Sequence, residues 1–288
     1  MLFKKKRKTL VGIVTFGNLP FTKLTVNSMR ETTKNKIDFY LIVGKPGDTA
    51  TIEWLEQEKI PYKVHDQNYG FPYSINDIYD YAWKDHNYDN LILAGNDIVT
   101  YPYAMDSLIN LAKDSEYLVI SGCQFDVRNL VDMFPETRQY FISGTHIFTA
   151  FDSKPWEVFK EYSEELAIAD MQLSDIQNLC LYKKEVFDLV GYTDVGFYPA
   201  YYIDNDYARR LVNSKVKCCT LGNARFFHFW SRTIHQETGG STSRNFENNR
   251  QYYVRKWGGD FGAETKEAAI KIDSREREMP VLEFWKNA

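Results

Sequence analysis

The sequence predicts an α/β fold in which helices flank a doubly wound, mostly parallel sheet. Three observations support this. Residues 9–16 form a nearly continuous run of β-branched and apolar residues, typical of a strand buried on both faces of a parallel sheet. Segments with strand and helix patterns then alternate over the first hundred residues, as in βαβ units. No repeat, low-complexity segment or Gly/Pro/Ser-rich linker interrupts the chain, which favours one globule.

The elements of the first hundred residues follow in a regular order. Gly17-Asn18 ends the opening strand, and Pro20 stands where a helix begins. Apolar residues recur at helical spacing from Phe21 to Met29, so a helix is expected up to Thr32. The alternation continues with predicted strands over 39–43, 62–65 and 90–94 and predicted helices over 50–59 and 73–84.

The remainder of the chain is less regular. Residues 124–176 show no clear period, and only a helix over 156–166 is expected there. Gly191 is expected to close a short helix at its C-terminal end. The other predicted elements are strands over 117–121, 179–182, 216–221 and 224–228, and helices over 102–113, 184–189, 206–213, 246–257 and 264–272.

The composition excludes several classes of protein. With 44% hydrophobic and 26% charged residues, the 288-residue chain is neither disordered nor collagen-like. No apolar run approaches the roughly 20 residues of a membrane-spanning helix. A net charge of -4 argues against non-specific nucleic-acid binding. Four cysteines without C-x-x-C spacing indicate a reducing compartment, and the basic residues within 1–8 are interpreted as a disordered tail.

Ligands of open α/β sheets bind at the carboxyl ends of the strands, so polar residues there are candidates. The first candidate segment is Thr15-Phe16-Gly17-Asn18, whose backbone amides could hold a nucleotide. The second is Asn68-Tyr69-Gly70, with Asn76 and Asp77 following in the next predicted helix. Glycine and asparagine also belong to ordinary turns, so a role in turn formation alone stays open for both segments.

Two further segments carry carboxylates. Asn96-Asp97 directly follows a buried strand, where a carboxylate needs a partner such as a divalent cation carrying a diphosphate. An Asx turn is the alternative. Asp204 and Asp206 lie at the start of a predicted helix, where one of them could cap the helix and the other could act as a general base. His228, between aromatic residues at a strand end, is either a metal ligand or a core histidine.

In their order and spacing these segments resemble the motifs of the family 2 glycosyltransferases with the GT-A fold, of bacterial or phage type. Residues 11–18 resemble the family's opening strand and turn, and residues 68–76 its N-x-G segment and following Asn. Asn96-Asp97 lies where the family carries its D-x-D or N-D-D metal motif. Residues 181–191 and 202–210 resemble its "E-V-F, then G" and "Y-x-D-x-D-x-x-x-R" segments, and His228 its late metal-binding His.

The resemblance implies a fold, a reaction and a set of site residues. The fold would be GT-A, with a Rossmann-like, mixed and mostly parallel sheet over 9–233 and a C-terminal helical extension over 234–288 packed on the same globule. A nucleotide-binding half would span about 9–100 and an acceptor half about 101–233. The reaction would be inverting transfer of a sugar from a nucleotide diphosphate to a hydroxyl, with Mn²⁺ or Mg²⁺ as cofactor.

The same resemblance assigns roles to single residues. Asp204 would be the general base with Asp206 as its neighbour, although the order of these two roles stays open. Asp97 and His228 would bind the metal. Donor-binding residues would be Thr15, Phe16, Asn18, Asp48, Asn68, Gly70, Asn76, Asn96, Asp97, Arg232 and Lys256.

Two departures from the family pattern affect these assignments. The metal motif has a single carboxylate, Asp97, so the metal would bind weakly or only together with the donor. Ile203 stands where many relatives have an acid, which favours Asp204 as the base. A catalytically inactive protein of the same fold that binds nucleotide sugars or glycans is the alternative function.

The resemblance leaves the substrates and the location less defined. A UDP-linked donor is favoured by analogy alone. A glycan, a lipid-linked intermediate, a protein and a modified nucleic-acid base all stay open as acceptors. A cytoplasmic location is expected, including the inner membrane surface or, for a phage protein, the host cytoplasm.

Overall fold

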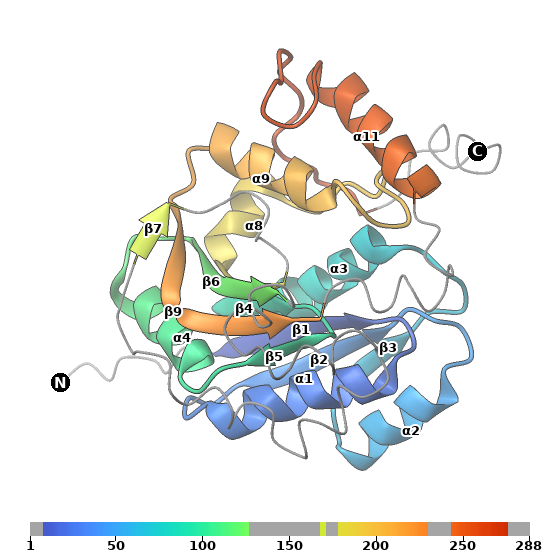
Figure 1. Cartoon of the computed structure of the whole chain (residues 1–288), viewed down its shortest axis with the longest axis vertical. Helices are drawn as coiled ribbons and strands as arrows, with labels where there is room; N and C mark the ends of the chain where they lie inside the picture. Colours follow the sequence, from blue (N-terminus) through green and yellow to red (C-terminus); the bar gives the residue numbers. More distant parts are fainter. Residues whose placement is uncertain (1–7, 127–167, 171–177, 230–242, 276–288) are drawn as a thin grey trace.

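A computed structural model describes residues 8–126, 168–170, 178–229 and 243–275 (Figure 1). Within them a single sheet has the strand order β3-β2-β1-β4-β8-β6-β9-β5, and β7 pairs with β9. The strands are β1 (Thr9–Thr15), β2 (Asp38–Val43), β3 (Tyr62–Val64), β4 (Asn90–Ala94), β5 (Ile98–Thr100), β6 (Val119–Asp126), β7 (Ile168–Asp170), β8 (Leu179–Lys183) and β9 (Cys218–His228). The predicted tail over 1–8, apart from Lys8, and the predicted helix over 156–166 lie outside the described residues.

The sheet is mixed, as expected for a GT-A fold. Strands β3, β2, β1 and β4 run parallel to one another, and β8 is antiparallel to its neighbours β4 and β6. β6 and β9 are parallel, and β5 is antiparallel to β9. The doubly wound pattern predicted from the alternation therefore holds for the first four strands and ends where β8 enters the sheet.

Helices cover both faces of the sheet (Figure 1). They are α1 (Leu19–Thr32), α2 (Thr49–Gln57), α3 (Phe71–Tyr79) with the π-helical turn η1 (Asp80–Asp85), α4 (Ala104–Asp114), α8 (Lys184–Val190), α9 (Ile203–Asn213) and α11 (Ser243–Trp257). Helices α1, α2 and α4 contribute to one apolar core, and α3, α8, α9 and α11 to the other. No helix in the described part is both long and apolar enough to cross a membrane.

Side-chain alternation along the strands explains the two cores. Leu10 points into the core under α3, whereas its neighbour Val11 points into the core under α1. Both are fully buried, so β1 needs apolar residues at consecutive positions. A Cβ on Gly12 would lie 2.4 Å from Ile78, so this glycine lets α3 pack directly on β1.

Several predicted elements differ from the observed ones. The predicted helix over 264–272 is wrong: apart from an isolated bridge between Gly191 and Ile272, this segment has no regular structure. Its backbone is held by other segments instead, because the amide of Tyr192 donates to the carbonyl of Ile272 at 2.9 Å. The predicted strands over 216–221 and 224–228 form one strand, β9, whose pairing with β6 shifts register between Gly122 and Cys123. Strand β5 was not predicted, because its three residues directly follow the turn that contains Asp97.

Candidate functional site

The end of β1 and the end of β4 are joined by a chain of hydrogen bonds. The hydroxyl of Thr15 donates to the carbonyl of Gly17 at 3.0 Å and lies 3.1 Å from the hydroxyl of Thr22 in α1. Asn96 donates its side-chain amide to the same Thr22 hydroxyl at 3.3 Å. Thr15 is fully buried, and its side chain organises the turn over residues 15–18, which we call the first turn. Asn96 is bonded to Thr22 in the helix that follows this turn.

The turn over residues 15–18 lies at the carboxyl end of β1. Asn18 has a left-handed backbone (φ 64°, ψ 41°) and precedes α1 without a side-chain capping bond. Phe16 and Asn18 are both half-buried. Asp48, at the start of α2, caps that helix, since its carboxylate accepts from the amide of Thr51 at 3.2 Å and from its hydroxyl at 2.7 Å.

Asp97 and His228 form a nearly buried pair. The Nε2 atom of His228 lies 3.2 Å from Oδ1 of Asp97. Strand pairing produces this contact, because Ile98 of β5 lies opposite His228 of β9 and the amide of Phe229 donates to the carbonyl of Asp97 at 3.0 Å. The two residues were singled out separately in the sequence, 131 positions apart (228 − 97), and the antiparallel pairing of β5 with β9 brings them together.

The Asp97–His228 pair suits a divalent cation with few protein ligands. A carboxylate is a favourable ligand for Mn²⁺ and Mg²⁺, and imidazole binds transition metals. Neighbouring ligands of an octahedral ion lie about 3 Å apart, close to the observed separation of 3.2 Å. Among the described residues no group of three His, Cys, Asp or Glu side chains lies close enough to hold a metal, so substrate oxygens or water would complete the coordination. The Nδ1 atom of His228 is buried without a hydrogen-bond partner in this part of the chain.

The Asn68–Gly70 turn contacts the segment that precedes α9. Asn68 accepts a hydrogen bond from the amide of Gly70 at 2.9 Å, and Gly70 adopts φ 84° and ψ 162°. The next amide, of Phe71, donates to the carbonyl of Pro199 at 2.7 Å. The Asn68–Gly70 turn therefore lies next to the segment that leads into Asp204, since Pro199 is five positions before Asp204.

Asn76 is used to hold the chain together. Its amide nitrogen donates to the carbonyl of Thr193 at 3.0 Å. Its Oδ1 atom accepts from the amide and the hydroxyl of Thr193, at 2.8 and 2.7 Å. The side chain is fully buried and engaged at both ends, so the structure gives it a fold-stabilising role, and donor binding by Asn76 stays a prediction from the resemblance.

Asp204 and Asp206 lie in different environments, although both are in the first turn of α9. Asp204 is partly exposed, and its carboxylate accepts from the amide of Asn205 at 2.9 Å. The two residues before α9, Tyr201 and Tyr202, both have positive φ (73° and 60°). Of the two carboxylates, that of Asp204 is the one accessible from the surface.

Asp206 is fully buried in an ion cluster. Its carboxylate lies 2.6 Å from Nζ of Lys256 and 3.0 Å from Nε of Arg210, and it accepts from the indole of Trp257 at 2.9 Å. Burial alone would raise the pKa of Asp206, but the charges of Lys256 and Arg210 and the hydrogen bonds hold this pKa below its ordinary value. Such a group is a poor proton acceptor, because it is inaccessible and stabilised in its charged form.

Lys256 belongs to the same cluster. Besides Asp206 it contacts Asp194 at 2.7 Å, and its side chain is only 12% exposed. Lys256, on α11, therefore contacts Asp206 of α9 and offsets the negative charge of the Asp194 and Asp206 carboxylates. Arg232, the other basic candidate for donor binding, lies outside the described residues.

A second ion cluster was not anticipated from the sequence. The nearly buried Asp77 lies 2.7 Å from Nζ of Lys63, 2.7 Å from Nε2 of His65, and contacts Arg275. Burial opposes ionisation of Asp77, but the hydrogen bonds from His65 and Lys63 and the charge of Arg275 hold its pKa below its ordinary value. His65 directly follows β3, and a histidine at a strand end is a signal that sequence analysis could have used. The contact of Arg275 with Asp77, in contrast, is formed only by the tertiary fold.

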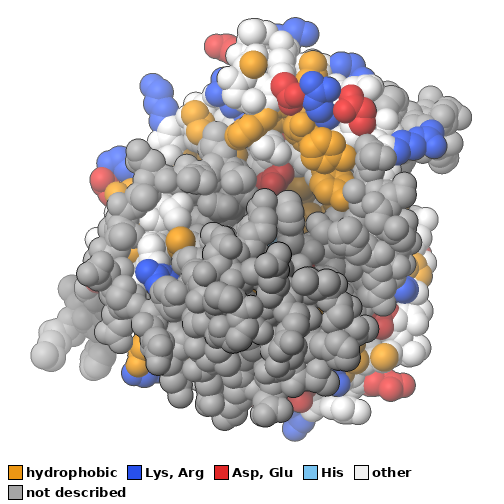
Figure 2. All heavy atoms as spheres, in the orientation of Figure 1, with side chains coloured by type: hydrophobic (Ala, Val, Ile, Leu, Met, Phe, Trp, Pro, Cys, Tyr) orange, Lys and Arg blue, Asp and Glu red, His pale blue; other side chains and the backbone are white. Residues whose placement is uncertain are grey.

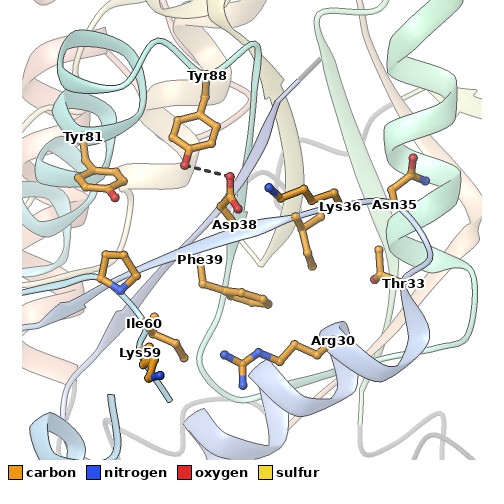
Figure 3. A pocket seen from close by; sticks show the side chains of 12 residues that line it. Arg30, Thr33, Asn35, Lys36, Asp38, Phe39, Lys59, Ile60, Tyr81 and Tyr88 are labelled. Atoms are coloured by element: carbon orange, nitrogen blue, oxygen red, sulfur yellow. Dashed lines mark hydrogen bonds between the residues drawn. The ribbon is translucent and has the colours of Figure 1, made fainter. Parts of the chain in front are cut away.

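A cavity of about 640 Å³ lies elsewhere, at the amino ends of β2 and β3 (Figure 3). Arg30, Phe39 and Lys59 are among its lining residues, and the hydroxyl of Tyr88 donates to Asp38 there at 3.2 Å. None of the sequence-predicted site residues lines it. Thr15 ends β1 and Asn96 follows β4, so both lie at the opposite, carboxyl ends of the parallel strands.

Comparisons with known proteins agree with this architecture. No protein-family model and no curated protein sequence matches the chain. The mannosyltransferase PcManGT from Pyrobaculum calidifontis, solved with GDP-Man and Mn²⁺, is similar with a TM-score of 0.55 and 9% identity over 92% of this chain and 67% of its own. GalNAc-T7, solved with UDP, GalNAc and Mn²⁺, is similar with a TM-score of 0.57 and 13% identity over 88% of this chain.

The chain spans 49% of the length of GalNAc-T7, about half. At these identities the similarity concerns the fold, which is the GT-A glycosyltransferase fold that the motif series implied.

Proposed function

We propose that the chain is an inverting glycosyltransferase that moves a sugar from a nucleotide diphosphate to an acceptor hydroxyl, with a UDP-linked donor favoured and Mn²⁺ or Mg²⁺ as cofactor. One observation carries the proposal: Asp97 and His228 pair at 3.2 Å at the candidate edge of the sheet. The fold is shared with two glycosyltransferases whose structures were solved with nucleotides and Mn²⁺.

The donor would bind along the carboxyl edge between the first turn and the Asn68–Gly70 turn. Backbone amides near Phe16 and Asn18 are suited to a nucleotide, since neither residue is fully buried. Asp97 and His228 would hold the divalent cation, which when bound supplies positive charge to neutralise the departing diphosphate. The hydrogen bond from Asn96 to Thr22 holds the residue that directly precedes Asp97.

Asp204 would act as the general base. Its carboxylate accepts the proton of the acceptor hydroxyl as that oxygen forms a bond to the anomeric carbon of the donor. The bond between the anomeric carbon and the diphosphate oxygen breaks, and its electron pair leaves with the diphosphate. Attack opposite the leaving group inverts the configuration. The partial exposure of Asp204 supports this role, whereas the burial and ion pairs of Asp206 do not.

The first test is a thermal-shift panel of UDP, GDP, dTDP and CMP, each with Mn²⁺, Mg²⁺ or chelator. A ligand that binds only the native state raises the melting temperature. We expect one nucleotide to stabilise the protein strongly, only with metal, and expect Asp97→Asn and His228→Ala to remove that stabilisation. Absence of any nucleotide effect in the wild type contradicts the proposal.

The second test separates binding from catalysis. With the donor identified, Asp204→Asn should retain nucleotide stabilisation and lose sugar transfer by a factor of at least about 100, the lower range for a general base. Asp188→Asn, which changes an exposed aspartate of α8, is the matched control and should retain full transfer. Normal turnover by Asp204→Asn contradicts the assignment of the base.

A further inference from the structure

Three aromatic rings meet beside the start of α9. The ring of Phe246, on α11, lies 5.6 Å from that of Tyr201 at 74° and 5.3 Å from that of Tyr202 at 58°. Phe246 is 44% exposed, and both tyrosines are partly exposed. On the coloured part of the face in Figure 2, hydrophobic side chains gather in the upper region, where Figure 1 places α9 and α11.

A side chain of α11 holds the segment that carries Tyr201 and Tyr202. Asn249, fully buried, donates its side-chain amide to the carbonyls of Phe197 (3.2 Å), Ala200 and Tyr201 (3.2 Å). These bonds hold the chain up to and including Tyr201, the first of the two residues with positive φ. The rings are therefore positioned before any ligand arrives, which lowers the entropy cost of binding.

Polar groups border the rings. The hydroxyl of Tyr202 donates to Asp260 at 3.3 Å, and Arg250 pairs with the same carboxylate at 2.6 Å and with Glu247 at 3.3 Å. The Arg250, Asp260 and Glu247 side chains are 40%, 37% and 48% exposed. Two carboxylates and one guanidinium sum to a charge of -1, which disfavours a phosphate-bearing partner.

We propose that Tyr201, Tyr202 and Phe246 form an acceptor subsite for a sugar ring of a neutral glycan. The C–H face of such a ring packs on aromatic rings, and its hydroxyls bond to neighbouring carboxylates and guanidinium groups. Asp204 follows Tyr202 by two positions, so the Cα atoms of these two residues lie within about 8 Å of each other. The inference rests on the proposed function, because it defines the acceptor class of that site.

The test measures retention of the labelled full-length chain on an immobilised panel of neutral oligosaccharides, with sulfated oligosaccharides and single-stranded DNA beside them. We expect retention on at least one neutral glycan, about 10-fold weaker binding for Phe246→Ala, and near-normal binding for Phe246→Tyr, which keeps the ring. A 10-fold loss corresponds to about 1.4 kcal/mol. The control is Tyr103→Ala, which removes a ring of similar exposure, 46%, at the start of α4 on the other side of the sheet.

The outcomes separate this inference from the proposed function. Absence of glycan retention, equal retention of wild type and Phe246→Ala, or selective retention on the sulfated or DNA probes each overturns the subsite. The nucleotide thermal-shift panel is run on the same samples, and Phe246→Ala should respond as the wild type does. Glycan retention that depends on Phe246 without any nucleotide response overturns the transferase and leaves the glycan site standing.

Discussion

The ammonium group of Lys256 lies 2.6 Å from the carboxylate of Asp206, and both side chains are nearly or fully buried. The contact joins the last turn of α11 to the first turn of α9, and Trp257 adds a hydrogen bond to the same carboxylate. The C-terminal helix is thereby fastened to the helix that carries Asp204. The ion pair thus links the extension to the candidate site without itself being accessible to a substrate.

Asp206→Asn should lower the free energy of unfolding by about 3 kcal/mol at pH 7, because it leaves buried positive charge without its partner. The pKa of Asp206 is below its ordinary value of 3.8 in the folded state, so its contribution is present above that pH and is lost as the pH falls through the lower folded value. Urea denaturation of both proteins at pH 7, 5, 4 and 3 checks this: the difference should stay constant to about pH 4 and shrink below it.

Asp273→Asn is the control for that measurement, since the side chain of Asp273 is 79% exposed and its pair with Lys271 is a surface contact. It should change stability by less than about 0.5 kcal/mol. Equal stability of Asp206→Asn and wild type at pH 7 would show that the buried pair does not stabilise the fold.

Asn76→Ala should cost about 2 kcal/mol of stability, because the buried amide of Thr193 loses its acceptor and the carbonyl of Thr193 loses its donor. Nucleotide stabilisation should persist in the folded variant. Asn68→Ala, at an exposed position of the neighbouring turn, is the comparison and should cost less. Thermal melts with and without the nucleotide identified in the panel measure both effects. A folded Asn76→Ala protein that no longer responds to nucleotide would support the donor-binding role predicted from the resemblance.

Gly70→Ala should destabilise the protein by about 2 kcal/mol or more, since its backbone lies in a region almost restricted to glycine. A Cβ there would also lie 2.7 Å from the ring of Tyr198. Gly47→Ala is the comparison, because Gly47 also has a positive φ, 72°, but no atom lies within 4 Å of the added carbon. That variant should lose about 1 kcal/mol from backbone strain alone. Chemical denaturation measures both, and equal losses would contradict the close approach of Tyr198.

Asn249→Ala should loosen the turn before α9 while leaving the far side of the sheet unchanged. Hydrogen exchange followed by mass spectrometry should show faster exchange, by about 10-fold, in peptides covering residues 197–205. If Asp204 is the base, turnover should fall with little change in nucleotide affinity, because the base is displaced and the donor site is not. Gln251→Ala, at an exposed position of the same helix, should change neither quantity. Unaltered exchange in this segment would contradict the positioning role of Asn249.

The regular part of the fold was predictable because its signals are local. Continuous apolar runs identified β1, β2 and β4, and Gly17-Asn18 and Pro20 located the start of α1. The helix expected over 264–272 failed because its backbone groups bond to distant segments, as Ile272 does to Val190 and Tyr192. A local sequence pattern cannot predict backbone hydrogen bonds to residues about 80 positions away.

The sequence by itself determined the α/β class, the alternation of the first strands and helices along the chain, and the position of the motif residues after strands, because side-chain periodicity and turn chemistry act over a few residues. Only the tertiary structure decided which of those residues meet. It paired Asp97 with His228, turned Asn76 toward Thr193, 117 positions away, and buried Asp206 against Trp257, 51 positions away. Burial and pairing depend on how the helices pack on the sheet, so two aspartates separated by one residue in sequence end in different environments.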